Sequence, residues 1–126
     1  MMISVLLVER DAAVARLYRE ELAEAGFVVR VLPDLDAALA DLRLRPAQVL
    51  VTDRDTVGQR LRAWLPQARQ VHDGPVVVLG PLREDREEDG QDLALVPKSS
   101  DLSPLIHSLR GQALRLLWSS AVAPAC

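Results

Sequence analysis

The chain has 126 residues, of which 49% are hydrophobic, and a formal net charge of -3 with acidic and basic residues interspersed. This length fits one domain of ordinary size, and this composition excludes a disordered chain. The sequence lacks a basic stripe for nucleic acid, an apolar run long enough to cross a membrane, and a second cysteine to pair with Cys126. We therefore expect a cytoplasmic protein with no nucleic-acid or membrane partner.

The first half of the chain predicts two strands and two helices. Asp11 can cap the first helix, and Gly26 ends it, because glycine adopts the backbone conformation that follows a helix C-terminus. Pro46 stops the second helix. The expected elements are a strand at 3–8, a helix at 14–25, a strand at 27–32 and a helix at 33–42.

The second half predicts three more strands. Pro66 interrupts an amphipathic helix, in which Trp64 is expected to be a core residue. Residues 81–92 are highly charged and almost without apolar side chains, so the fourth helix is expected to be short. Ser100 or Asp101 can cap the last helix. The expected elements are strand 49–52, helix 59–70, strands 76–79 and 93–96, and helix 102–117.

Strand and helix alternate about five times, which predicts an α/β domain with a parallel sheet covered by helices on both faces. In such sheets, chemistry gathers beyond the carboxyl ends of the strands. The candidate site therefore consists of the residues expected at those ends, which are Glu9, Arg10, Asp11, Asp53, Asp55, Gly80 and Lys98.

Three segments in this order resemble the receiver domains of CheY-like response regulators in two-component signalling. They are LLVERD after the first strand, VLVTD after the third, and LVPKSSDLSPL after the fifth. The resemblance covers roughly residues 3 to 110. It implies a flavodoxin-like (βα)5 fold with a doubly wound, five-stranded parallel sheet. It also implies a receiver-like domain over 1–118 and a C-terminal tail over 119–126.

The resemblance implies a role for each matching residue. Asp53 matches the phosphoacceptor, and Lys98 matches the lysine that pairs with it and with the phosphoryl oxygens. Glu9 matches the first acid of the pair that holds Mg²⁺, so Glu9 and Asp53 would be the metal ligands. The partners implied are a histidine kinase or an output protein, and the resemblance leaves a homodimer open.

The sequence departs from the family where the metal and the phosphoryl group would bind. Arg10 takes the place of the second acid, and Gly80 takes the place of a Ser or Thr hydroxyl. Leu95 replaces the usual switching aromatic residue, and Ser99 replaces the usual proline after the lysine. We therefore expect a stand-alone atypical receiver that is not an enzyme, acts through protein contact, and has little or no phosphorylation at Asp53.

The same departures from the family pattern affect whether the protein binds Mg²⁺. We expect no resident cofactor and hypothesise that Arg10 replaces Mg²⁺ by pairing with Asp53, Asp55 or Glu9, supported by Lys98. A guanidinium stays charged at any ordinary pH and can bind a carboxylate through two parallel hydrogen bonds.

Two alternatives stay open. Asp53 and Asp55 after an apolar strand resemble the nucleophile motif of haloacid-dehalogenase-type phosphohydrolases, although two strand–helix units precede them here. The second alternative is a single-domain phosphorelay protein that is competent for phosphorylation. A flavin- or nucleotide-binding module is disfavoured, because Glu9 and Asp11 would repel a phosphate at the first turn.

Three further aromatic or imidazole side chains carry weaker expectations. His72 and His107 have no partner at ligand spacing and are expected to be surface residues. Trp118 could cap the core or belong to an exposed apolar patch that binds a partner.

Overall fold

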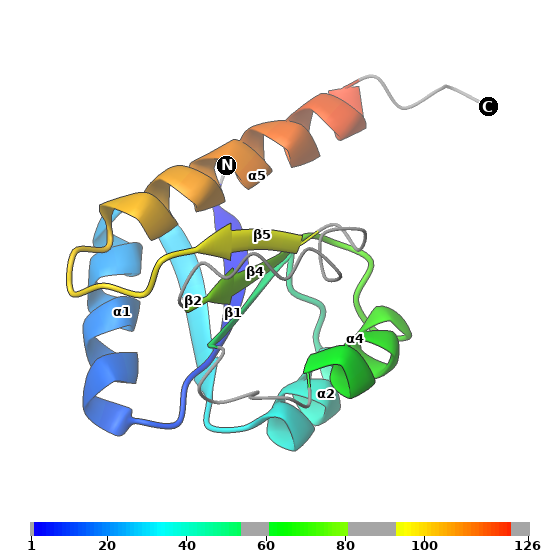
Figure 1. Cartoon of the computed structure of the whole chain (residues 1–126). Helices are drawn as coiled ribbons and strands as arrows, with labels where there is room; N and C mark the ends of the chain where they lie inside the picture. Colours follow the sequence, from blue (N-terminus) through cyan, green and yellow to red (C-terminus); the bar gives the residue numbers. More distant parts are fainter. Residues whose placement is uncertain (1, 54–60, 81–92, 122–126) are drawn as a thin grey trace.

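A computed structural model describes residues 2–53, 61–80 and 93–121 (Figure 1). It confirms the predicted α/β fold with one five-stranded parallel sheet. The strands are β1 Ile3–Val8, β2 Phe27–Leu32, β3 Val49–Asp53, β4 Val76–Leu79 and β5 Leu93–Val96. The helices are α1 Ala12–Glu24, α2 Leu35–Leu44, α4 Leu61–Arg69 and α5 Ser103–Ala121.

The strands lie in the order β2-β1-β3-β4-β5. The three inner strands are almost wholly buried, whereas β2 and β5, at the edges, are mostly half-buried. This explains why the inner strands read as continuous apolar runs, since both of their faces are covered by helices. Because all strands are parallel, their carboxyl ends meet at one edge, as the candidate site requires.

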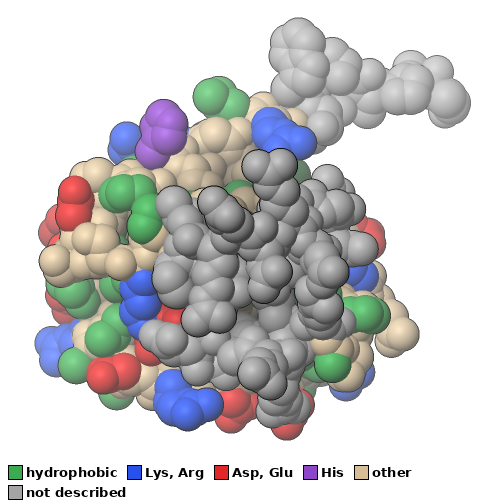
Figure 2. Space-filling view, viewed as in Figure 1, with side chains coloured by type: hydrophobic (Ala, Val, Ile, Leu, Met, Phe, Trp, Pro, Cys, Tyr) green, Lys and Arg blue, Asp and Glu red, His purple; other side chains and the backbone are tan. Residues whose placement is uncertain are grey.

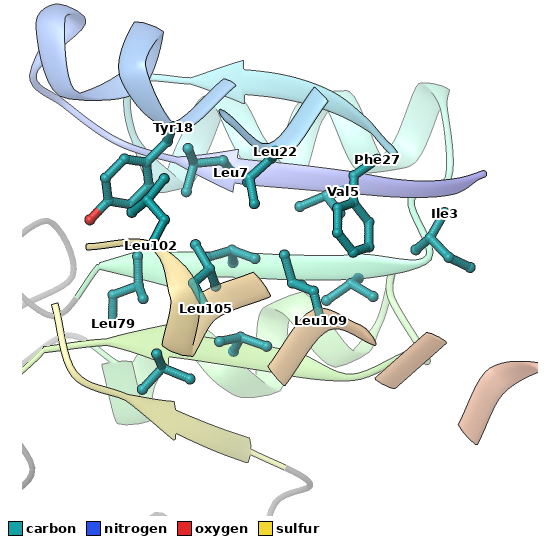
Figure 3. Packing of buried hydrophobic residues seen from close by; sticks show 14 residues of the cluster. Ile3, Val5, Leu7, Tyr18, Leu22, Phe27, Leu79, Leu102, Leu105 and Leu109 are labelled. Carbon is teal, nitrogen blue, oxygen red and sulfur yellow. The ribbon is translucent and has the colours of Figure 1, made fainter. Parts of the chain in front are cut away.

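Alternate residues of each strand point to opposite faces of the sheet and build two cores. On one face α1 and α5 cover the sheet, and Tyr18, Leu22, Leu105 and Leu109 pack against the strands (Figure 3). On the other face α2 and α4 cover it, and the buried Trp64 confirms its expected core position. Burying each leucine of this kind stabilises the fold by about 1.5–3 kcal/mol.

Short polar side chains and one glycine set the ends of α1 and α2, and the roles predicted for Asp11 and Gly26 are confirmed. Asp11 accepts hydrogen bonds from the amides of Ala13 and Val14, at 2.9 and 3.2 Å, and so caps α1. Asp34 caps α2 through the Ala37 amide. Gly26 follows α1 with a φ of 100°, a conformation that costs glycine little because it lacks a Cβ.

The structure differs from the sequence predictions at two helices. Helix α4 continues through Pro66 instead of being broken there. Helix α5 runs to Ala121, beyond the helix end expected at residue 117. The side chain of Trp118 and the segments 54–60 and 81–92, including the expected short fourth helix, lie outside the described residues.

The two histidines differ from each other. His107 is exposed, as predicted. The prediction for His72 is wrong, because only 4% of this residue is exposed. Its Nε2 lies 3.0 Å from the carbonyl oxygen of Pro75, which can only accept, so Nε2 donates. Its imidazole thus provides a hydrogen-bond donor to a backbone carbonyl in the turn between α4 and β4. This turn lies at the edge of the sheet opposite the candidate site.

The described surface carries mixed charge. Figure 2 shows acidic and basic side chains interspersed on the described part of one face. Within the described ranges, no helix is long and apolar enough to cross a membrane.

Candidate functional site

The candidate site centres on Asp53, the last residue of β3, which is completely buried. A carboxylate without contact to water requires a charged or hydrogen-bonding partner. Lys98, two residues beyond the end of β5, supplies it, because its Nζ donates to Oδ2 of Asp53. The structure thus brings together the two residues that the sequence predicted as acceptor and lysine.

Glu9, directly after β1, joins this pair from the neighbouring strand. Its side chain is only 4% exposed, and its Oε2 lies 3.6 Å from Lys98 Nζ. Its Oε1 accepts a hydrogen bond of 3.1 Å from the Asp11 amide. We call Glu9, Asp53 and Lys98 the carboxyl-edge triad. It comprises two buried carboxyl groups and one ammonium group.

The pKa values of Glu9 and Lys98 reflect the excess of acidic over basic groups in the carboxyl-edge triad. Burial raises the pKa of Glu9, the Asp11 amide and Lys98 oppose the rise, and the nearby Asp53 adds to it. Burial acts to lower the pKa of Lys98, but the hydrogen bond and charge of Asp53 and the charge of Glu9 outweigh it and raise that pKa. Lys98 is therefore a cation at any ordinary pH and is shared by two acids.

Arg10 and Asp11 follow Glu9 but are not part of the carboxyl-edge triad. Both are exposed, and the Asp11 carboxylate caps α1. Within the described ranges Arg10 makes no ion pair with Glu9 or Asp53. The hypothesis that Arg10 neutralises these acids is therefore not supported, since Lys98 is the cation beside both. Asp55, the third acid proposed to pair with Arg10, lies outside the described residues.

Gly80 follows β4 at the same edge. It is buried, and its amide donates to the Val96 carbonyl at 3.0 Å, so its backbone joins β4 to β5. It offers no hydroxyl to a phosphoryl group. Leu95, at the place of the family's aromatic residue, is half-buried on β5.

Tyr18 of α1 lies beside the carboxyl-edge triad and is a site residue that the sequence analysis did not single out. Its hydroxyl donates to the carbonyl of Ser99, next to Lys98, at 3.4 Å. Burial raises its pKa, with Lys98 opposing and the two acids adding to the rise. The available sequence signal was the hydroxyl itself, because a buried tyrosine usually finds a polar partner.

Metal-binding side chains are sparse among the described residues of the candidate site. Mg²⁺ needs several oxygen ligands in near-octahedral geometry. In residues 2–53, 61–80 and 93–121, no three His, Cys, Asp or Glu side chains form a group that could hold a metal. The two carboxyls that do meet, Glu9 and Asp53, already share the Lys98 ammonium.

Sequence comparison identifies no relative of this chain. No family model matches it. No curated protein matches it either.

Comparison of structures gives a consistent result. A CheY-like response regulator receiver domain from Methylobacillus flagellatus superposes with a TM-score of 0.78 and 20% identity, over 89% of this chain and 99% of that one. A response regulator from Thermotoga maritima gives 0.77 and 17%, over 89% and 98%. A structure described as an adenylate cyclase from Rhodopirellula baltica gives 0.80 and 18%, over 96% of both chains. At these identities the likeness establishes the CheY-like, flavodoxin-like fold.

Proposed function

We propose that this chain is an atypical receiver-like signalling domain. It acts in the cytoplasm through contact with a partner protein, a histidine kinase or an output protein, and it is not an enzyme. The fold shared with response regulator receivers supports a signalling role. Asp53 ends the third strand along the chain. This position disfavours the phosphohydrolase alternative, because in that family the strand that carries the nucleophile is the first of the fold.

Arg10 in place of a second acid and Gly80 in place of a hydroxyl residue carry the atypical part of the proposal, because Lys98 beside the two buried acids follows the family pattern. A phosphoryl donor would bring more negative charge to Asp53, beside Glu9, with Arg10 where a second acid ligand would be and no hydroxyl at Gly80. Phosphorylation of Asp53 would require this charge to be compensated. We therefore expect it to be weak or absent.

Intact-mass spectrometry after incubation with acetyl phosphate and Mg²⁺ tests this. The parent should gain little or no phosphoryl group, and the Arg10→Asp variant, which restores an acid, should gain more. Fast, stoichiometric phosphorylation of the parent at Asp53 would establish the phosphorelay alternative instead. Steady phosphate release from phosphomonoesters would favour the phosphohydrolase.

A further inference from the structure

A groove runs beside the candidate site, between α1 and the end of β2. Its volume is about 270 Å³, and three of its lining side chains are arginines, Arg10, Arg16 and Arg19. Small or apolar residues of α1, of β2 and of the position after β2 also line it, namely Ala12, Ala15, Val31 and Pro33. We call this the arginine groove. It concentrates positive charge on a chain whose net charge is -3.

Within the described ranges, these arginines make few ion pairs with other residues of the protein. Arg16 pairs with Glu20, but that pair is exposed, with side chains 75% and 60% accessible. Arg10 and Arg19 are exposed and make no ion pair within the described ranges. Among the described residues, the one acid that lines the groove is Glu9, which is buried and engaged by the Asp11 amide and Lys98. The groove therefore attracts anions.

The arrangement favours a row of carboxylates over a single phosphate. Arg16 and Arg19 lie about 4.5 Å apart along the helix axis, and Arg10 precedes the helix, so the charges form a row. In an extended peptide, alternate side chains are about 7 Å apart on one side, which suits such a row. A phosphate at the start of α1 would instead meet the Asp11 carboxylate, which already occupies the amides of Ala13 and Val14.

We propose that the arginine groove docks an acidic, extended segment of the partner protein. This proposal rests on the proposed signalling function and names the chemistry of the partner. Guanidinium groups bind carboxylates through paired hydrogen bonds, and the small apolar side chains between them allow a peptide backbone to approach closely.

Fluorescence anisotropy with a labelled ten-residue peptide of alternating Glu and Ser tests the proposal on the full chain. The peptide should bind, and Arg10→Gln/Arg19→Gln should weaken binding about tenfold, because each exposed ion pair contributes up to about 1 kcal/mol. The control Arg43→Gln/Arg115→Gln removes the same charge from exposed positions on α2 and α5 and should change binding less than about twofold. Glu20→Gln should strengthen binding by releasing Arg16.

Several results would overturn the proposal. They are no binding by the parent, equal weakening by the control pair, or tight binding of inorganic tripolyphosphate to the same arginines without binding of the peptide. None of them bears on phosphorylation of Asp53, so failure here leaves the signalling proposal intact. Conversely, fast phosphorylation in the mass-spectrometric assay would leave the result for the groove unaffected.

Discussion

Lys98 is the residue on which the carboxyl edge depends. Asp53 is completely buried and the Glu9 side chain nearly so, and the Lys98 ammonium lies within ion-pair distance of both. Two buried carboxyls beside each other repel when both are ionised. The role of Lys98 here is therefore electrostatic neutralisation, and this role can be tested without any phosphodonor.

We expect Lys98→Met to lower the free energy of unfolding by about 3 kcal/mol at neutral pH, because it leaves two buried acids without their cation. The loss should shrink as the pH falls and Glu9, whose pKa burial raises, takes up a proton, and Asp53→Asn in the same background should recover part of it. Urea unfolding followed by circular dichroism measures both effects. The control Arg16→Gln breaks an exposed pair and should cost at most about 0.5 kcal/mol. An equal loss in both variants would contradict the argument.

His72 makes stability depend on pH in mild acid. Burial lowers the pKa of its imidazole below the ordinary value, Arg69 adds to this, and the hydrogen bond with Pro75 opposes it. The folded state therefore binds a proton less readily than the unfolded state. The stability due to neutral His72 is present above the unfolded pKa, about 6.5, and is lost as pH falls from there toward the folded pKa.

We expect stability to fall between pH 7 and pH 5, with a contribution from His72 of at most about 1.4 kcal/mol per pH unit. In His72→Gln that contribution should disappear, and in the exposed-site control His107→Gln it should persist. Thermal melts across this range compare the three proteins. Parallel pH profiles for parent and His72→Gln would show that burial of the ring does not control its protonation.

Among the elements, α4 contains a built-in defect. Pro66 lies inside this nine-residue helix, where it lacks the amide hydrogen for an intrahelical bond. The helix nevertheless persists because Trp64, Leu65 and Ala68 are buried in the core that it shares with α2. Tertiary packing therefore outweighs the local preference against a helix here.

Replacing this proline should stabilise the protein. We expect Pro66→Ala to raise the free energy of unfolding by about 1–2 kcal/mol, since the interior penalty of about 3 kcal/mol is partly offset by the greater freedom of the unfolded alanine chain. Pro104 lies in the first turn of α5, where the missing amide costs little, so Pro104→Ala should change stability by less than about 0.5 kcal/mol. Chemical denaturation of the two variants decides the matter. A Pro66→Ala protein less stable than its parent would contradict this account of α4.

At the scale of the whole molecule, the fold was predictable and part of the site was not. Apolar runs alternate along the chain with amphipathic segments that begin at capping residues. The strands, the capped starts of α1 and α2 and the position of Asp53 could therefore be placed from local pattern alone. The resemblance to the receiver family implied the pairing of Lys98 with Asp53. The position of Glu9 beside the same ammonium depends on side-chain directions across β1, β3 and the loop after β5, which no local pattern records. The burial of His72 and the hydrogen bond from Tyr18 to Ser99 were not predictable either, because they form only when segments distant in the sequence meet.

The order of the strands along the chain has a bearing on how the protein is made. Glu9 and Asp53 leave the ribosome well before Lys98, although the inner strands that carry them could already pair. Until β5 arrives, closing the sheet over these acids would bury them without the Lys98 ammonium, at a cost of several kcal/mol. A nascent chain that ends before residue 93 should therefore keep its carboxyl edge open and hydrated. Docking of β5 places Lys98 beside the two acids. We therefore expect it to be the step that commits the domain to its folded state.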